Sequence, residues 1–419
     1  MSGNNANIRK WSGEDTAWMF TLFGTAVGAG ILFLPLKAGT GGIWPVLIAA
    51  LLIGPMTYLA HRGLARVCLT SSNPDGDITD AVTEHFGGAA GSLITLGYFI
   101  AIYPIVMVYG IGLTNAVTNV AVNLLGMETP NRLILSGVIV IGLVLIMLTS
   151  HKVVVRVTEL IVTPLVLILL GVSLYLIPQW EFSRFEFDGD WGGMIKTVLL
   201  MIPLLVFAFN HSPAVSTFAG DYRKAEGDVN AEPLASRTLL RTSMMLTVFV
   251  MFFVFSCVMA LSPDELAQAR ANNLSTLDAF AGREVEGINW FGWLASAVAM
   301  IAITSSFFGH YLGTAEGLHG LIAQRLRGGN PNKAINDKAI RTFVTIFIVV
   351  TVWWVANANW SVIGMIEDIV SPILAIILFI MPVVATRTVP AMAKYRSAAD
   401  IFTLVAGLIA IGGKIISLL

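Results

Sequence analysis

The sequence predicts an all-α protein that crosses a membrane many times, and its composition and patterning support this. Hydrophobic residues make up 56% of the 419 residues, charged residues make up only 12%, and the mean hydropathy is +0.78. Soluble domains carry roughly 25% charged residues. Apolar runs recur along the whole chain, and helices satisfy their own backbone hydrogen bonds inside lipid. We therefore expect a polytopic helical protein embedded in a lipid bilayer.

Eleven apolar runs are long enough to be membrane spans, because a hydrocarbon core of about 30 Å takes roughly 20 residues of helix. The expected spans are 15–37, 42–67, 89–123, 131–150, 156–178, 192–219, 239–261, 288–322, 340–357, 361–386 and 398–417. The chain is thereby divided into an N-terminal tail (1–14), a core of ten spans (15–386) and an additional eleventh helix (398–419).

The distribution of positive charge predicts the orientation. Most of the 25 Lys and Arg residues fall in loops on the same side as the N-terminus. Loops rich in Lys and Arg stay in the cytoplasm. The N-terminal tail is therefore expected in the cytoplasm and, after an odd number of spans, the C-terminus on the opposite side. The first apolar run lacks a signal-peptide cleavage site, so we expect it to remain as the first span.

Composition and motifs argue against several other functions. A net charge of −1 argues against a nucleic-acid partner. The six histidines are scattered, and neither His-Glu-x-x-His nor Gly-x-Ser-x-Gly occurs, which argues against an enzyme. A channel is less favoured, because no filter-like repeat of carbonyl donors and no ring-forming charged motif is present. We expect no cofactor.

The first apolar run is interrupted by three glycines, Gly24, Gly28 and Gly30. Each glycine disfavours a continuous helix by about 1 kcal/mol relative to alanine. Non-helical backbone at membrane depth is tolerated only where it lies inside the protein or lines a cavity. We therefore predict two half-helices here, with close glycine packing between continuous helices as the alternative.

The sixth apolar run is interrupted in the same way, by the sequence Asn210-His211-Ser212-Pro213. Proline breaks a continuous helix but suits the first turn of a new one. Interrupted spans in first and sixth position indicate an inverted repeat of five plus five spans, with the binding site at the breaks. The first repeat is expected at about 15–178 and the second at about 192–386.

The two breaks offer opposite charges to a ligand, because unpaired N–H groups start a half-helix and unpaired C=O groups end one. A zwitterionic amino acid fits this arrangement. Its carboxylate is expected on the amides of Gly28, Ala29 and Gly30, where little side chain hinders approach. Its ammonium group is expected on carbonyls near Val27 and Phe209.

Side chains at the sixth break are expected to set selectivity. Asn210, His211 and Ser212 are polar at membrane depth and need partners, which a ligand hydroxyl can supply. Two alternatives remain open: Asn210 satisfies backbone freed by Pro213, and His211 makes a structural hydrogen bond or transfers a proton. Two residues outside the breaks complete the expected substrate site, Tyr103 and Ser306.

The eighth apolar run carries the candidates for ion coupling. Adjacent hydroxyls at Thr304 and Ser305 can ligate Na⁺ together with carbonyls of the first span. Hydroxyls that bond back to their own helix are the alternative. The glycines that recur every four residues from Gly309 are expected to form a packing stripe. The full set of expected ion-coupling residues is Thr25, Gly28, Thr304, Ser305 and His310.

Six stretches of this sequence resemble the bacterial hydroxy and aromatic amino acid permease family, particularly its serine and threonine transporters. They are Gly24–Pro35, Ala60–Leu64, Ala101–Pro104, Phe209–Pro213, Gly309–Gly313 and Gly364–Glu367. The resemblance implies a symporter of the LeuT-like fold in the bacterial inner membrane, with a periplasmic C-terminus, that imports serine or a related small neutral amino acid with protons.

The resemblance also leaves alternatives. Threonine or an aromatic amino acid is the alternative substrate within the family. Serine and threonine members commonly place a lysine where this chain has Ser305. A hydroxyl in place of an ammonium group favours a bound cation, so the coupling ion is expected to be either H⁺ or Na⁺.

Overall fold

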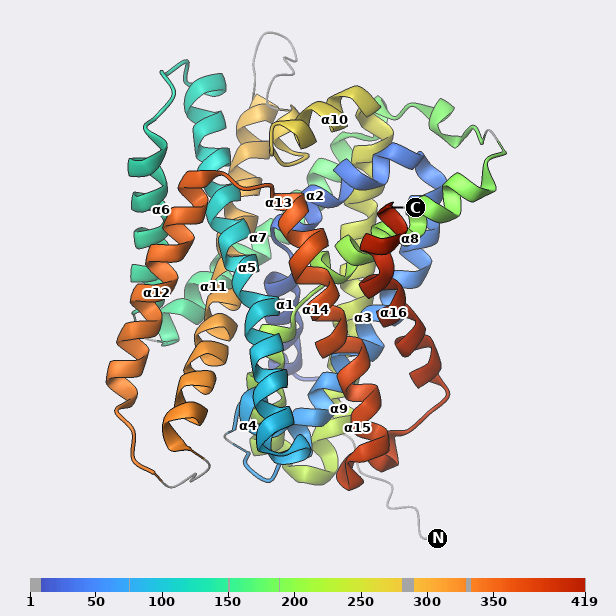
Figure 1. Cartoon of the computed structure of the whole chain (residues 1–419). Helices are drawn as coiled ribbons and strands as arrows, with labels where there is room; N and C mark the ends of the chain where they lie inside the picture. The colour runs from blue at the N-terminus through green and yellow to red at the C-terminus, as the bar shows by residue number, and fades with distance from the viewer. Residues whose placement is uncertain are drawn as a thin grey trace.

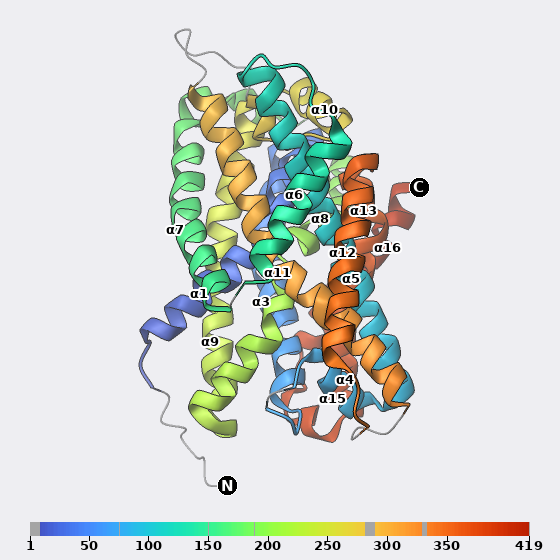
Figure 2. The same cartoon turned by 90° about the vertical axis from the view of Figure 1, so that its left-hand side faces the viewer.

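The computed structural model describes residues 9–418 except for 75, 150, 188, 281–289 and 329–332, and these residues contain helices and no strands. The helices form one bundle (Figures 1 and 2). In both views α4 (Ile78–Phe86) and α15 (Met381–Thr388) lie at one end, and α10 (Pro263–Ala271) lies at the other. We call these the α4 end and the α10 end. The N-terminal tail is described only from residue 9 onward.

Most of the bundle consists of long helices that overlap the expected spans. They are α3 (Ile43–Leu69), α5 (Gly88–Asn119, continued by a π turn at Val120–Leu124), α6 (Arg132–Met147), α7 (His151–Tyr175), α11 (Trp290–Arg327), α12 (Asp337–Ala358) and α16 (Ala399–Leu418). The most extensive helix pairs are α3 with α9 (Val215–Ala260) and α11 with α5.

The first span is broken, as the glycines predict. Helix α1 (Gly13–Ala26) ends where Val27 leaves helical geometry (φ −75°, ψ 97°), and α2 (Ala29–Ala38) starts after Gly28. The two helices are bent by 55° relative to each other.

The sixth span is broken at Asn210 and His211. Helix α8 (Trp191–Ala208) ends before them, and a 3-10 turn at Ser212–Ala214 with proline in its first turn leads into α9 (Val215–Ala260). This confirms the expected role of the proline as a helix starter. Gly227 (φ 71°) divides α9 into two helical parts.

Within the described residues, helix covers most of each of the eleven expected runs. Within the described residues, seven helical stretches are long and apolar enough to cross a membrane, or up to eight when the bent pair α1 and α2 counts as one. Two shorter apolar helices are α6 and Ala399–Gly413. The stretch Trp191–Ala260 is 70 residues long and contains the sixth expected span and all but the last residue of the seventh.

The tenth span is irregular although it runs without interruption. It consists of α13 (Val362–Met365), a π turn (Ile366–Val370), α14 (Ser371–Ala375), a second π turn (Ile376–Ile380) and α15. The extra residue of a π turn redirects nearby side chains, and such turns often lie at functional sites. Helix α16 packs against α8, α14 and the second π turn.

The two halves of the first span are anchored to different partners. At the α4 end, the buried Asp15 carboxylate accepts hydrogen bonds from Arg9 (2.6 Å), Tyr222 (2.5 Å) and Arg237 (3.3 Å).

Toward the α10 end, the anchors of α2 come from two other parts of the chain. The Leu32 carbonyl accepts hydrogen bonds from the backbone N–H and the hydroxyl of Thr276 (2.9 and 2.6 Å). Lys37 Nζ lies 3.0 Å from Glu367 of the first π turn. The break therefore separates a half-helix held by α9 from one held by a loop and the tenth span.

The glycine stripe on α11 packs closely, as expected. A Cβ added to Gly309 would lie 2.9 Å from Thr25 Cγ2, and one added to Gly313 would lie 2.8 Å from Pro213 Cβ. Such distances leave no room for a side chain. Helix α11 therefore lies directly against both broken spans.

Candidate functional site

The two breaks and α11 meet at one place in the bundle. A Cβ added to Gly30 would lie 2.5 Å from Ala208 Cα, so the start of α2 touches the end of α8. A Cβ added to Gly28 would lie 2.3 Å from Ser306 Oγ. The glycines of the first break thus bring backbone against the sixth span on one side and a hydroxyl of α11 on the other.

The first break leaves the start of α2 without a side-chain cap among the described residues. The Val27 N–H still donates to Phe23 O (2.8 Å), which completes α1. Gly28 is the N-cap of α2, and no described side chain caps this helix. The first amides of α2, at Ala29 and Gly30, therefore lack a capping acceptor from a side chain, as anion binding at a helix start requires.

The sixth break is held by its own polar residues. Asn210 Oδ1 accepts the Ser212 N–H (3.1 Å), so Asn210 satisfies backbone freed by the proline. The His211 ring contacts Phe209 O through Nδ1 (3.1 Å). The Phe209 carbonyl, expected to bind a ligand ammonium group, therefore already has one donor.

The neighbouring hydroxyls of α11 point in different directions. Ser305 Oγ donates to Ala302 O of its own helix (3.0 Å). Ser306 Oγ donates to Thr25 O at the end of α1 (2.9 Å). Thr304 is half-buried. The hydroxyl that joins α11 to the carbonyl end of α1 is thus that of Ser306.

Two of the expected ion-coupling groups take part in contacts around the breaks. The Thr25 side chain bonds to Thr21 O of its own helix (2.9 Å), so Thr25 contributes its carbonyl. His310 Nδ1 lies 2.9 Å from Ser306 O, and its Nε2 lies 3.3 Å from Asn210 Nδ2. The amide orientation of Asn210 therefore makes His310 Nε2 an acceptor and Nδ1 a donor.

Two tyrosines of α5, Tyr103 and Tyr109, lie in different surroundings. Tyr103 stacks on Phe99 (centroids 4.9 Å apart) and lies against Phe347 of α12, away from the breaks. Tyr109 packs edge-on against His310 (5.3 Å), and its hydroxyl lies beside Gly28. The structure thus brings Tyr109, and not the expected Tyr103, to the site.

A second residue at the site, besides Tyr109, is absent from the sequence-based set. His61 of α3 accepts the His211 N–H through Nε2 (3.1 Å) and stacks on the His211 ring. Two signals for His61 are present in the sequence. It is a histidine in the middle of an apolar helix, and it lies in Ala60–Leu64, one of the stretches that carry the family resemblance.

The site is sealed from solvent. No more than 2% of the surface is exposed for Val27, Phe209, Asn210, His211, Ser212, Ser306 and His310. Every polar group here must therefore find a partner in the protein or a ligand.

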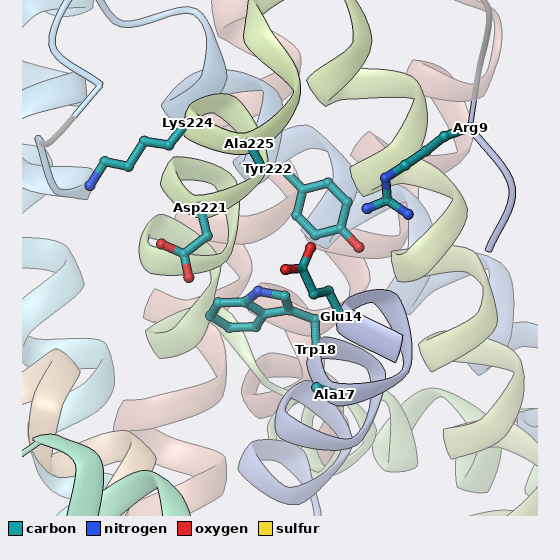
Figure 3. A pocket seen from close by; sticks show the side chains of 8 residues that line it. All are labelled: Arg9, Glu14, Ala17, Trp18, Asp221, Tyr222, Lys224 and Ala225. Atoms are coloured by element: carbon teal, nitrogen blue, oxygen red, sulfur yellow. The ribbon is translucent and has the colours of Figure 1, made fainter. Parts of the chain in front are cut away.

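A cavity of about 460 Å³ lies between the N-terminal part of α1 and α9. It is lined by Arg9, Glu14, Ala17 and Trp18 before and in α1, and by Asp221, Tyr222, Lys224 and Ala225 of α9 (Figure 3). Trp18 packs edge-on against the buried Phe218 (5.4 Å). Since Trp18 lies nine residues before Val27, the cavity wall is about 14 Å of helix from the break.

Comparisons with known proteins agree over nearly the whole chain. Residues 16–405 match the profile of the Tryptophan/tyrosine permease family. The chain is 44% identical over 415 residues to the serine transporter SdaC of Escherichia coli K12, which covers 97% of this chain and 96% of that protein. SdaC of Shigella flexneri matches with the same identity and coverage.

Solved structures show the fold. MhsT in complex with L-phenylalanine matches with a TM-score of 0.62 at 15% identity, over 96% of this chain and 100% of that one. The manganese transporter of Eremococcus coleocola matches with a TM-score of 0.60 at 14% identity, over 100% of this chain and 90% of that one. The expected LeuT-like fold is thereby confirmed. The chain belongs to the Tryptophan/tyrosine permease family and is a multi-pass membrane transporter, not an enzyme.

Proposed function

We propose that the protein imports serine, or a related small neutral amino acid, across a bacterial inner membrane by cation-coupled symport. The observation that carries this proposal is the contact between the two broken spans at Gly30 and Ala208. There the uncapped start of α2 faces the carbonyl end of α8. The serine transporters at 44% identity support the choice of substrate.

The substrate charges find complementary groups at the breaks. The carboxylate binds the amides of Ala29 and Gly30, whose helix starts with a partial positive charge. The ammonium group binds carbonyls that end α1 and α8, near Val27 and Phe209. The substrate hydroxyl lies within the polar set formed by Asn210, His211, Ser212, Ser306 and Tyr109.

The transport cycle exposes this sealed site alternately to the two sides of the membrane, as in other inverted-repeat transporters. With the N-terminal tail in the cytoplasm, the α4 end faces the cytoplasm, and the cavity between α1 and α9 is the exit path. The C-terminus lies in the periplasm. The coupling ion is H⁺ or Na⁺, with Na⁺ bound by hydroxyls of Thr304 and Ser305 and carbonyls of the first span.

The direct test is uptake of radiolabelled serine into proteoliposomes under separate H⁺ and Na⁺ gradients. We expect serine to accumulate above its equilibrium concentration under one of the two gradients. The accumulated serine should leak out when an ionophore collapses that gradient. Accumulation under neither gradient contradicts the proposal, and equilibration without accumulation indicates a channel. Competition by unlabelled threonine, tryptophan and tyrosine tests the alternative substrates.

Ser306→Ala is expected to weaken serine binding more than Ser305→Ala. The first change removes the hydroxyl that donates to Thr25 O, whereas the second removes one that bonds to its own helix. Loss of one hydrogen bond costs about 0.5–1.5 kcal/mol, which is roughly a 2- to 12-fold increase in Kd. Serine binding by isothermal calorimetry measures the difference, and equal effects of the two changes contradict a special role for Ser306.

A further inference from the structure

Two histidines from different parts of the chain form a stacked pair at the sixth break. The rings of His61 and His211 lie 3.5 Å apart between centroids, with an angle of 11° between their planes. His61 is 2% exposed and His211 is fully buried. A buried pair of titratable rings needs an explanation, because ordinary packing is supplied more easily by apolar side chains.

The hydrogen bonds of His61 fix it as a neutral ring. Its Nδ1 donates to Thr57 O (2.9 Å), and its Nε2 accepts the backbone N–H of His211 (3.1 Å). Both nitrogens are therefore used, and a second proton on His61 would displace the N–H of His211.

His211 differs because one nitrogen is open. Its Nδ1 donates to Phe209 O (3.1 Å), and its Nε2 has no hydrogen-bond partner among the described residues. A proton can bind to Nε2 without breaking any hydrogen bond of the protein. The Phe209 carbonyl ends α8, and a helix C-terminus stabilises a positive charge.

The charged and titratable groups on the surrounding helices are occupied elsewhere or lie far away. On α3, Arg62 pairs with Glu232 of α9 (3.2 Å). On α11, Glu316 accepts hydrogen bonds from the Ile78 N–H (3.2 Å) and from Ser216 (3.3 Å).

Three further groups complete these surroundings. His310 of α11 contacts Asn210, and Asp15 of α1 is paired with Arg9 at the α4 end. Lys196 of α8 lies about 20 Å of helix before Phe209. Among the described residues, no hydrogen bond or ion pair joins a carboxylate to either ring of the pair.

We propose that the His61–His211 pair holds the coupling proton, bound to Nε2 of His211, with His61 as the positioning residue. This rests on the proposed symport function. The pair takes a single proton from the side to which the site is open, forming one N–H bond, and gives it up on the other side. Two stacked imidazolium ions would repel each other, so the pair never carries two charges. His61 holds the His211 backbone in place and covers one face of its ring.

The test compares two activities in proteoliposomes that contain the full-length protein. Serine/serine exchange needs no net proton movement, whereas accumulation under a pH gradient does. With one proton per serine, a gradient of one pH unit accumulates serine about tenfold. We expect His211→Gln to lose this accumulation by a larger factor than it lowers exchange. His85→Gln is the matched control, because His85 of α4 bonds to Thr70 and Val67, away from the breaks.

The positioning role of His61 is tested by the pH profile of exchange. His61→Phe keeps a stacked ring but removes the acceptor of the His211 N–H, so the pH midpoint of exchange should shift. His61→Gln keeps an acceptor and should restore the midpoint of the unmodified protein. An unchanged midpoint in His61→Phe overturns this role.

The outcomes separate the two proposals. Full proton-driven accumulation by His211→Gln overturns the proton site while the transporter function stands. Accumulation driven by Na⁺ alone, without proton uptake on adding serine, overturns it as well. If the unmodified protein shows neither exchange nor accumulation of serine, the proposed function itself is contradicted.

Discussion

Replacing Gly30 with alanine is expected to reduce serine transport more than any other single methyl group added to the chain. The new Cβ would lie 2.5 Å from Ala208 Cα and 3.0 Å from the Phe207 ring. The first contact is with backbone, which cannot rotate away as a side chain can. Overpacking of this kind costs about 1–3 kcal/mol, or roughly 5- to 150-fold in binding.

The same change at Gly142 of α6 is the control, because a Cβ there would meet nothing within 4 Å. Both variants are compared by initial uptake rate and by serine affinity, with size-exclusion chromatography to verify folding. A well-folded Gly30→Ala protein that transports at the rate of Gly142→Ala would show that close contact between the two breaks is not required for transport.

The largest effect on stability is expected for Asp15→Asn. The Asp15 side chain is fully buried and accepts hydrogen bonds from Arg9, Tyr222 and Arg237. Removing its charge takes the carboxylate partner from Arg237 and leaves Arg9 paired with Glu226 alone. Breaking a buried charge pair from one side costs about 3–5 kcal/mol.

Glu14→Gln is the control for this change, since Glu14 is the exposed neighbour on the same helix turn and faces the cavity. Unfolding in detergent, followed by circular dichroism, gives the free energy of unfolding of each variant. Equal stability of the two variants would mean that the Asp15 network contributes little, and that α1 is held by apolar packing alone.

The fold followed from local features of the sequence. Apolar runs gave the spans, and glycine and proline are local signals whose effect on a helix does not depend on distant residues. The breaks at Gly28 and at Asn210–Pro213 were therefore predicted where the structure has them. The family resemblance is confirmed by the comparisons.

The direction in which each helix side chain points could not be predicted from the sequence in the same way. Tyr103 and Tyr109 are six residues apart, which turns them about 240° around the helix. Both were reasonable candidates, and only the packing of α5 against α11 brings Tyr109 to the breaks. Ser305 and Ser306 differ by about 100° for the same reason. The roles of these residues in binding stay predictions.

His61 shows a second limit of prediction from the sequence, which is that contacts between distant residues leave no local pattern. Its partner His211 lies 150 residues further along the chain, and the pair forms only because α3 packs beside the sixth break. A single histidine in an apolar helix is by itself compatible with many surroundings. No local pattern links two such residues, so the pair required the three-dimensional structure.

The separate anchors of α1 and α2 have a kinetic consequence. Asp15 ties α1 to α9, whereas Lys37 and Leu32 tie α2 to the tenth span and to the loop at Thr276. No continuous helix joins α1 to α2 across the break. A displacement of the contacts that anchor α1 is therefore not passed directly to the contacts that anchor α2. Entry and release of the cargo can therefore have independent energy barriers, so that each rate can change in evolution without the other.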